Sequence, residues 1–215
     1  MLLARSTMMA MIASSATVAQ AEPGPVRLAL NIGSLGAGPE IGFRPSRWVS
    51  IRGSFSLAAA KHHRDIGDIR YGGRLRLRNY AVMGDVHPLG NGWRLSAGLG
   101  GNGNRVRLKA MPMAPVTVGA RTYTPAEIGT LRGEITTRDY APIVTVGYGG
   151  PLARHFTVSG DAGVMFHGRP RMGPLTSTTT LIAAADLAIE RDRIQRDIRK
   201  YRLYPVLQLS LGYRF

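Results

Sequence analysis

Short segments in which apolar and polar residues alternate are the main pattern along this chain. The last segment shows it most clearly, because Leu207, Leu209, Leu211, Tyr213 and Phe215 alternate with smaller or more polar residues. Successive side chains of a strand point to opposite faces, so this pattern predicts a strand with one apolar face that ends in two aromatics. Such a face packs against a second sheet in a soluble sandwich, or contacts lipid in a membrane barrel.

Comparable alternating segments precede it, and most have the length of about ten residues that a tilted membrane strand requires. They cover residues 26–33, 35–43, 48–58, 71–86, 93–108, 134–148 and 156–167. The alternation changes parity at residues 33–36, which predicts a tight turn or a bulge, so the segment 26–43 forms either two strands or one. Pro39 lacks a ladder donor and favours an edge or a bulge. A slip in the pattern around Asn79 and Tyr80 predicts another bulge.

The connections between these segments alternate in length. Short connections rich in turn residues are expected at 44–47, 87–92 and 149–154, and long ones at 59–70, 109–133 and 168–202. This alternation is typical of an up-and-down barrel with both termini on the side of the short turns. We therefore predict an all-β fold, a single antiparallel transmembrane β-barrel of about eight strands with one helix in the last external connection.

The predicted helix covers residues 183–200. Leu187, Ile194 and Ile198 recur there at helical spacing among many charged residues. Its narrow apolar stripe could cap the barrel mouth or lie on lipid headgroups.

Composition narrows the class further. No apolar stretch approaches the ~20 residues that a spanning helix needs. Cysteine is absent from the chain, which excludes disulfides and any cysteine-based metal site or nucleophile. The formal net charge of +15 favours a polyanionic partner, such as nucleic acid, an anionic membrane surface or the phosphates of lipopolysaccharide.

The N-terminus resembles a secretory signal peptide. Arg5 is followed by a short apolar core from Met8 to Ala13 and by the small-x-small sequence Ala19-Gln20-Ala21. We expect residues 1–21 to be the signal peptide and residues 22–215 the mature barrel. Export by this route argues against nucleic acid as the physiological partner.

Together, these features resemble the small outer-membrane β-barrels of Gram-negative bacteria. The residues that carry the resemblance are the alternating strands, the signal and the ending Leu209-Ser210-Leu211-Gly212-Tyr213-Arg214-Phe215. The stretch 33–43 and the group Asp85, His87 and Pro88 are similar to uncharacterised members of the eight-stranded class. The resemblance implies an outer-membrane location and recognition of the last strand by the barrel-assembly machinery, through Leu209, Leu211, Tyr213 and Phe215. It implies no catalytic residue, cofactor or metal.

Charged residues on the parities assigned to the barrel interior form one group of candidates. The interior of a barrel of about eight strands is just wide enough to be filled by side chains. A cross-linked polar plug is therefore favoured over a pore for small anions or apolar solutes. The members of this predicted interior network are Arg52, Arg74, Arg76, Arg78, Arg94, Glu40, Asp85 and Asp161.

Basic residues on the expected external loops form a second group. They could contact the phosphates of lipopolysaccharide through charge-assisted hydrogen bonds, or they could simply keep the loops soluble. These residues are Arg64, Arg70, Lys109, Arg121 and Arg132.

Enzymatic and metal sites are less favoured. The pair His62-His63 with Asp65 and Asp68 matches no zinc spacing. Asp161 and His167 share a parity but lie roughly 20 Å apart along an extended strand, so they could not bond directly. We expect a monomeric, non-enzymatic barrel with a structural or surface-interaction role. A narrow channel is the alternative, and a lipid-modifying enzyme is less favoured than either.

Overall fold

The computed structural model describes residues 25–215, so the expected signal peptide lies outside the described part of the chain. The longer strands are β1 (Val26–Gly33), β2 (Gly36–Phe43), β3 (Val49–Ile66), β4 (Ile69–Val86), β5 (Trp93–Asn102), β6 (Arg105–Pro112), β9 (Leu131–Thr136), β10 (Tyr140–Pro151), β11 (Phe156–Met165) and β14 (Tyr204–Arg214). The shorter elements are β7 (Val116–Val118), β8 (Arg121–Tyr123), α1 (Pro125–Ile128), β12 (Arg171–Met172) and β13 (Thr176–Ser177). The longer helix is α2 (Ala184–Ile198).

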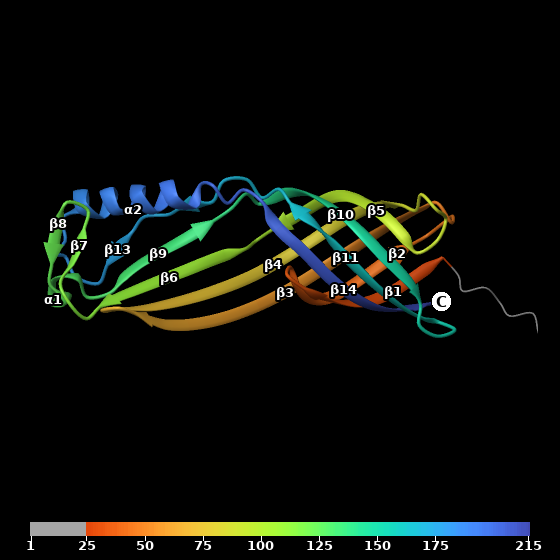
Figure 1. The fold of residues 1–215 in the computed structure, drawn as a ribbon, viewed down its shortest axis with the longest axis horizontal. Helices are drawn as coiled ribbons and strands as arrows, with labels where there is room; N and C mark the ends of the chain where they lie inside the picture. The colour runs from red at the N-terminus through yellow and green to blue at the C-terminus, as the bar shows by residue number, and fades with distance from the viewer. Residues whose placement is uncertain (1–24) are drawn as a thin grey trace, which may run out of the picture.

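Eight antiparallel strands close into a ring. Their order is β1-β2-β3-β4-β5-β10-β11-β14, and β14 pairs back onto β1. The ring occupies the right half of the molecule in Figure 1. Closure leaves no free strand edge within it, which satisfies the backbone hydrogen bonds of every strand.

An open part of the same sheet extends from one end of the ring. The strands β3 and β4 are paired along their whole lengths, from Val49 opposite Val86 to Ile66 opposite Ile69, and so run through both halves. Beyond the ring, β6 pairs with β4, β9 pairs with β6, and β12 and β13 pair with β9. We call this part the extension; it forms the left half of Figure 1.

The sheet divides where β4 changes partner. Residues Asn79–Val86 of β4 pair with β5, and Ile69–Arg76 pair with β6. At the junction the Gly103 N–H donates to the Arg78 carbonyl at 2.8 Å, and the Arg78 N–H donates to the Asn104 side chain at 3.1 Å. These bonds link β4 to residues 103 and 104, between the part of β4 that pairs with β5 and the part that pairs with β6.

Several sequence-based expectations are resolved by this arrangement. Residues 26–43 form two strands with a turn at Ser34 and Leu35, and the β2–β3 register has no paired residue at Gly38 or Pro39, where the proline cannot donate. The bulge expected near Asn79 is absent, because the register of β4 is continuous there.

Two of the expected long loops are also wrong. Residues 59–70 are mostly strand, because β3 and β4 form one long hairpin with a turn at Gly67 and Asp68. Residues 109–133 contain the end of β6, the β7–β8 hairpin and α1. The three short connections lie together at the end of the ring away from the extension, close to both described termini (Figure 1).

The predicted helix exists, and it does not cap the mouth of the ring. It lies along the extension in Figure 1, and Gln195 accepts a hydrogen bond from the Met172 N–H of β12 at 2.8 Å. Leu187 packs against an apolar cluster of Val118, Tyr123, Ile128 and Ile182. No helix within residues 25–215 is both long and apolar enough to cross a membrane.

Candidate functional site

The interior of the ring contains a charged layer near the short connections. Arg52 of β3 is its centre, because its guanidinium contacts three carboxylates: Glu40 at 3.4 Å, Asp85 at 3.0 Å and Asp161 at 3.0 Å. Arg27 joins the layer by donating to Glu40 at 2.9 Å. Five residues of the predicted interior network, including Arg94, therefore come together here, with Arg27 as an addition.

Asp161 of β11 holds two arginines at once. Its Oδ1 accepts from Arg52 Nη2 at 3.0 Å and from Arg94 Nε at 3.1 Å. Its Oδ2 accepts from Arg52 Nη1 at 3.0 Å and from Arg94 Nη2 at 2.5 Å. The Asp161 side chain is only 2% exposed. Two bidentate pairs on one buried carboxylate are strong, geometrically specific interactions.

An apolar layer fills the interior between the charged layer and the extension. It consists of buried residues from four strands and from the β1–β2 turn, whose Leu35 is folded inward; the members are Leu35, Ala81, Met83, Ala141, Ile143, Met165 and Val206. The hollow bordered by Leu35, Ser56 and Met165 measures only about 10 Å³, which is about the space of a single water. This layer of the interior is therefore packed with side chains.

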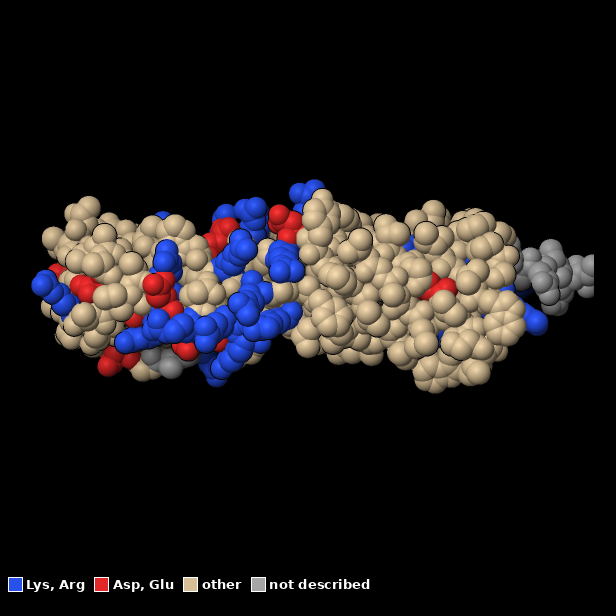
Figure 2. All heavy atoms as spheres, turned by 90° about the horizontal axis from the view of Figure 1, so that it is seen from above, with Lys and Arg blue, Asp and Glu red and all other residues tan. Residues whose placement is uncertain are grey.

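The outward face of the ring is apolar. Large hydrophobic side chains on every ring strand are exposed there, including Leu30, Ile51, Val82, Leu99 and Leu209, the last at 63% exposure. Figure 2 shows the same division: the ring is almost free of charged side chains on the face seen, whereas Lys and Arg gather on the extension. A contiguous exposed apolar surface of this kind marks contact with another apolar phase or partner.

The terminal-strand residues lie on this apolar surface. Leu209 and Leu211 are exposed, and Tyr213 packs edge-to-face against Phe156 and Phe215 with ring centroids 5.4 and 5.1 Å apart. Tyr213, Phe156 and Phe215 form an aromatic cluster at the end of the ring that carries the short connections.

On the extension, the same sheet face changes from apolar to basic. Along β4 the outward parity contains Val86, Val82 and Tyr80 and continues with Arg78, Arg76 and Arg74. The register places neighbouring strands' basic residues in rows across this face. The rows are Arg76–Arg105, Lys61–Arg74–Arg107–Glu134 and Lys109–Arg132–Thr176. We call this surface the basic face.

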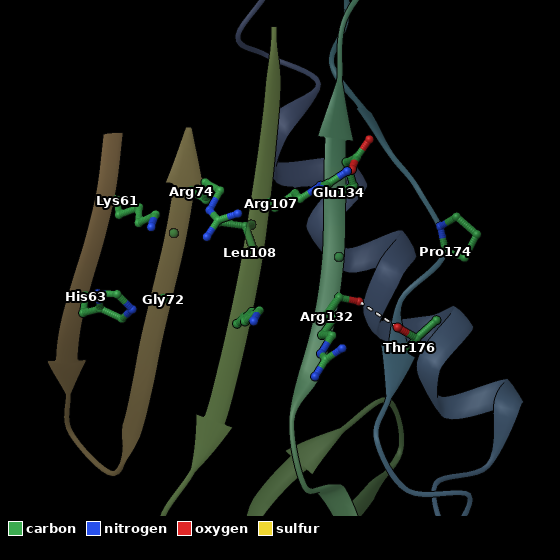
Figure 3. A pocket seen from close by; sticks show the side chains of 13 residues that line it. Lys61, His63, Gly72, Arg74, Arg107, Leu108, Arg132, Glu134, Pro174 and Thr176 are labelled. Carbon is green, nitrogen blue, oxygen red and sulfur yellow. Dashed lines mark hydrogen bonds and ion pairs between the residues drawn. The ribbon is translucent and has the colours of Figure 1, made fainter. Parts of the chain in front are cut away.

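The basic face contains a hollow of about 630 Å³. Figure 3 shows Lys61, Arg74, Arg107 and Glu134 following one another across four strands, with α2 behind the sheet in this view. Glu134 is the acidic member, and it accepts from Arg107 at 2.7 Å and lies 3.7 Å from Arg105. Gly72 contributes no side chain to the floor, so the cationic groups surround an open space.

The prediction that Arg74, Arg76 and Arg78 belong to the interior network is wrong. All three are exposed and share the outward parity of Tyr80 and Val82. The inward parity of this strand contains Leu77 and Asn79 instead. Where β4 leaves the ring, its outward residues change from apolar to basic while the parity stays the same. In the sequence, this change cannot be distinguished from a change of parity.

The predicted external residues separate into three groups. Lys109 and Arg132 lie opposite each other on the basic face. Arg70 is on the same face but pairs with Asp65 at 3.2 Å. Arg64 has the opposite parity, next to the space beneath α2, and Arg121 is on the β7–β8 hairpin away from the rows. The structure thus brings together only two of the five.

Four basic residues of this face were in neither predicted group: Lys61, Arg105, Arg107 and Arg171, the last aligned with Arg105 through Thr136 of β9. Arg105, Arg107 and Lys109 alternate with Val106 and Leu108, so strand periodicity could have found them. The pairing of β6 with β4 and β9, which sets them beside Arg74 and Arg132, could not be read from the sequence.

Solved structures that share this fold include two from Acinetobacter baumannii. Acinetobacter baumannii CarO2 matches with a TM-score of 0.66 and 18% identity, over 90% of this chain and 100% of the CarO2 chain. Acinetobacter baumannii CarO matches with a TM-score of 0.59 and 18% identity, over 91% of this chain and 99% of that chain. No protein-family model matches the sequence, and no characterised relative is found at a significant level of sequence similarity. The likeness to CarO2 and CarO establishes the fold and leaves function to be argued from the residues.

The histidine candidates are separated by the fold. His62 and His63 are neighbours in β3, opposite Gly73 and Gly72, so their side chains point to opposite faces of the sheet. His167 packs against Tyr204 with ring centroids 6.2 Å apart, whereas Asp161 is occupied by two arginines in the charged layer. These residues form neither a chelating pair nor a catalytic pair.

Proposed function

We propose that this chain is a monomeric, non-enzymatic outer-membrane β-barrel with a closed lumen, and that its basic face binds the phosphates of lipopolysaccharide. The observation that carries the proposal is the continuity of one sheet face, which is apolar around the ring and basic directly beyond it. Lipid acyl chains would contact the first part and anionic headgroups the second.

The dimensions of the apolar surface support membrane insertion. Tyr80 and Tyr140 flank Gly101 in the register, which places both at the extension end, and Trp93 and Tyr148 pack edge-to-face at the other end, 5.2 Å between centroids. From Tyr140 to Tyr148 the strand rises about 27 Å, or roughly 20 Å along a barrel axis at the usual strand tilt. This is close to the ~25 Å apolar band between the aromatic girdles of outer-membrane barrels.

The distance of the arginines from this girdle supports headgroup contact. Along β4, Arg78 is about 7 Å beyond Tyr80, Arg76 about 14 Å and Arg74 about 20 Å, at ~3.4 Å per residue. The polar interface adds roughly 5–8 Å to each side of the hydrocarbon core. Arg78 and Arg76 would therefore lie near the lipid phosphates, and the Arg74 row and the Lys109 row among the more distal anionic groups.

The positive charge of this face is largely uncompensated. Glu134 and Asp65 are paired with Arg107 and Arg70, whereas Arg74, Lys109 and Arg132 have no ion pair with any residue of the described range 25–215. Guanidinium groups are well suited to bidentate contact with phosphate. We also propose that the exposed aromatic end of β14 is the segment that the barrel-assembly machinery recognises.

Binding of lipopolysaccharide to the purified barrel in non-ionic detergent tests the proposal. The triple variant Arg74→Gln, Lys109→Gln and Arg132→Gln should lose at least about tenfold in affinity, because each removes a charge-assisted contact. A matched control removes three positive charges from exposed residues on and after α2: Arg196→Gln, Arg199→Gln and Arg202→Gln. Its affinity should remain close to that of the wild type.

Dephosphorylated lipopolysaccharide provides the second arm. It should bind the wild-type barrel as weakly as intact lipopolysaccharide binds the triple variant. Equal losses in the two triple variants would show that net charge, rather than the basic face, determines binding. Undiminished binding of the dephosphorylated lipid would rule out phosphate as the recognised group.

A further inference from the structure

A cavity of about 460 Å³ opens at the end of the ring that carries the short connections. It lies at the opposite end of the ring from the extension and its basic face. Side chains from several ring strands and from the turns between them line it, and the charged layer forms its floor. The cationic residues that border it are Arg27, Arg44, Arg52, Arg94, Arg154 and Arg214.

The floor of the cavity is electrically balanced. Arg27, Arg52 and Arg94 are matched by three carboxylates, those of Glu40, Asp85 and Asp161. Arg27 is saturated further by Thr157 Oγ1 at 2.9 Å and Ser159 Oγ at 3.2 Å. These three arginines are therefore committed to the charged layer.

The mouth of the cavity is not balanced. Arg44 and Arg214 are half-buried, Arg154 is exposed at the rim, and none of the three forms an ion pair with another residue in the range 25–215. Counting all six arginines against the three carboxylates leaves three positive charges in excess. Low-dielectric walls concentrate the field of such an excess within the cavity.

Arg44 is fixed in position by its own turn. Its Nε donates to the Ser46 carbonyl at 3.3 Å and its Nη2 to the Arg47 carbonyl at 2.7 Å. Burial lowers the pKa of Arg44, and the nearby Arg214 and Arg94 lower it further. The crowding of cations around Arg44 is thus an electrostatic cost that a bound anion would relieve.

A buried histidine stands beside these arginines. His87 lines the cavity and is 4% exposed; its Nε2 lies 3.0 Å from Ser50 Oγ, and its Nδ1 has no hydrogen-bond partner within the described chain. Burial and then the charge of Arg44 lower the pKa of His87, so the ring is neutral at pH 7 and adds no positive charge. A neutral imidazole here provides a polar wall for a ligand held by the arginines.

We propose that this cavity binds a phosphate group, held between the guanidinium groups of Arg44 and Arg214. An oxyanion with more than one negative charge matches the excess of positive charge, and paired guanidinium groups supply the donors that phosphate oxygens accept. The group could belong to free phosphate or to a phospholipid headgroup. This site and the proposed lipopolysaccharide surface share no residues, and they lie at opposite ends of the molecule.

Isothermal titration of the purified, folded barrel with inorganic phosphate at pH 7 tests the proposal, with ionic strength held constant by chloride. The tightest phosphate site should be the cavity, and Arg44→Gln with Arg214→Gln should weaken binding at that site at least about tenfold. The control Arg196→Gln with Arg199→Gln, which removes the same charge from exposed residues at the end of α2, should bind phosphate like the wild type. Arg214→Lys keeps the charge but loses the planar fork, and should give an intermediate affinity.

A second titration uses short-chain phosphatidic acid in the same detergent. Binding of this lipid but not of inorganic phosphate, with the same dependence on Arg44 and Arg214, would identify a headgroup as the source of the phosphate. The proposal is overturned if neither probe binds, or if the α2 control loses as much affinity as the cavity variant. A failure of the lipopolysaccharide-binding test would not change this result, because the basic face and the cavity share no residues. The two proposals can therefore fail independently.

Discussion

The central ion pair of the charged layer provides the sharpest test of how the ring is stabilised. Replacing Asp161 with Asn preserves the shape of the side chain but removes the charge that holds Arg52 and Arg94. The side chains of the two arginines are 10% and 8% exposed, so water cannot replace the lost carboxylate. Removing one partner of a buried pair costs about 3–5 kcal/mol.

A surface carboxylate provides the matched control. Glu134 also contacts two arginines, Arg105 and Arg107, but their side chains are 58% and 55% exposed. Exposed pairs contribute about 0–1 kcal/mol, so Glu134→Gln should change stability little. The two substitutions remove the same group from similar partners and differ mainly in burial.

Urea unfolding of the folded barrel in lipid vesicles measures the difference. The fluorescence of Trp48 and Trp93, which lie at the short-connection end of the ring, reports the transition, and linear extrapolation yields the free energy of unfolding. We expect Asp161→Asn to lower it by about 3–5 kcal/mol. A loss of under about 1 kcal/mol, or a loss equal to that of Glu134→Gln, would refute the view that the charged layer stabilises the interior.

Two further predictions concern the extension and the lumen. Asp186 of α2 accepts from Tyr123 Oη at 2.6 Å and from the Ala120 N–H at 3.0 Å, and these bonds lower its pKa. A carboxyl group whose pKa is lowered by folding stabilises the folded state at pH values above its unfolded pKa of about 3.9. This stabilisation is lost as the pH falls through the pKa of the folded state. Spin labels on α2 and β7 should therefore separate only below about pH 4, and Tyr123→Phe should raise the onset; separation unaffected by pH would contradict this linkage. In planar bilayers the wild-type barrel should show no steady conductance, since the apolar layer that contains Leu35 and Met165 fills the middle of the ring. Regular channel openings of the wild-type barrel would favour the alternative of a narrow pore.

The strand pattern of the ring was readable from the sequence, since each ring strand has one face toward apolar surroundings and one toward a packed interior. This local constraint repeats every second residue, so Leu209, Val144 and Val158 could be placed outward without knowing their neighbours. The short connections were equally readable, because turns depend on adjacent residues such as Asn91 and Gly92. Arg52, Arg94 and Asp161 followed from the same parity argument.

The extension was not readable in this way. Its strands are long continuations of β3 and β4 joined by segments from two other connections. Where β4 leaves β5 for β6, the type of residue on each parity changes although the strand continues without a bulge. Only the surroundings of the strand change at Arg78, and a change of surroundings looks the same in the sequence as a change of parity. Arg74, Arg76 and Arg78 were misplaced for this reason.

By itself, the amino-acid sequence determined that this chain forms antiparallel strands with one apolar face, and which charged residues are available to pair. The tertiary structure alone decided that Arg105, Arg107, Lys109 and Arg132 stand beside Arg74 on one surface, and that Arg44 and Arg214 face a common cavity. The physical reason is that alternation along a strand is set by neighbouring residues. The grouping of charges across strands depends on pairing between segments far apart in the chain, which follows from the closure of the whole sheet.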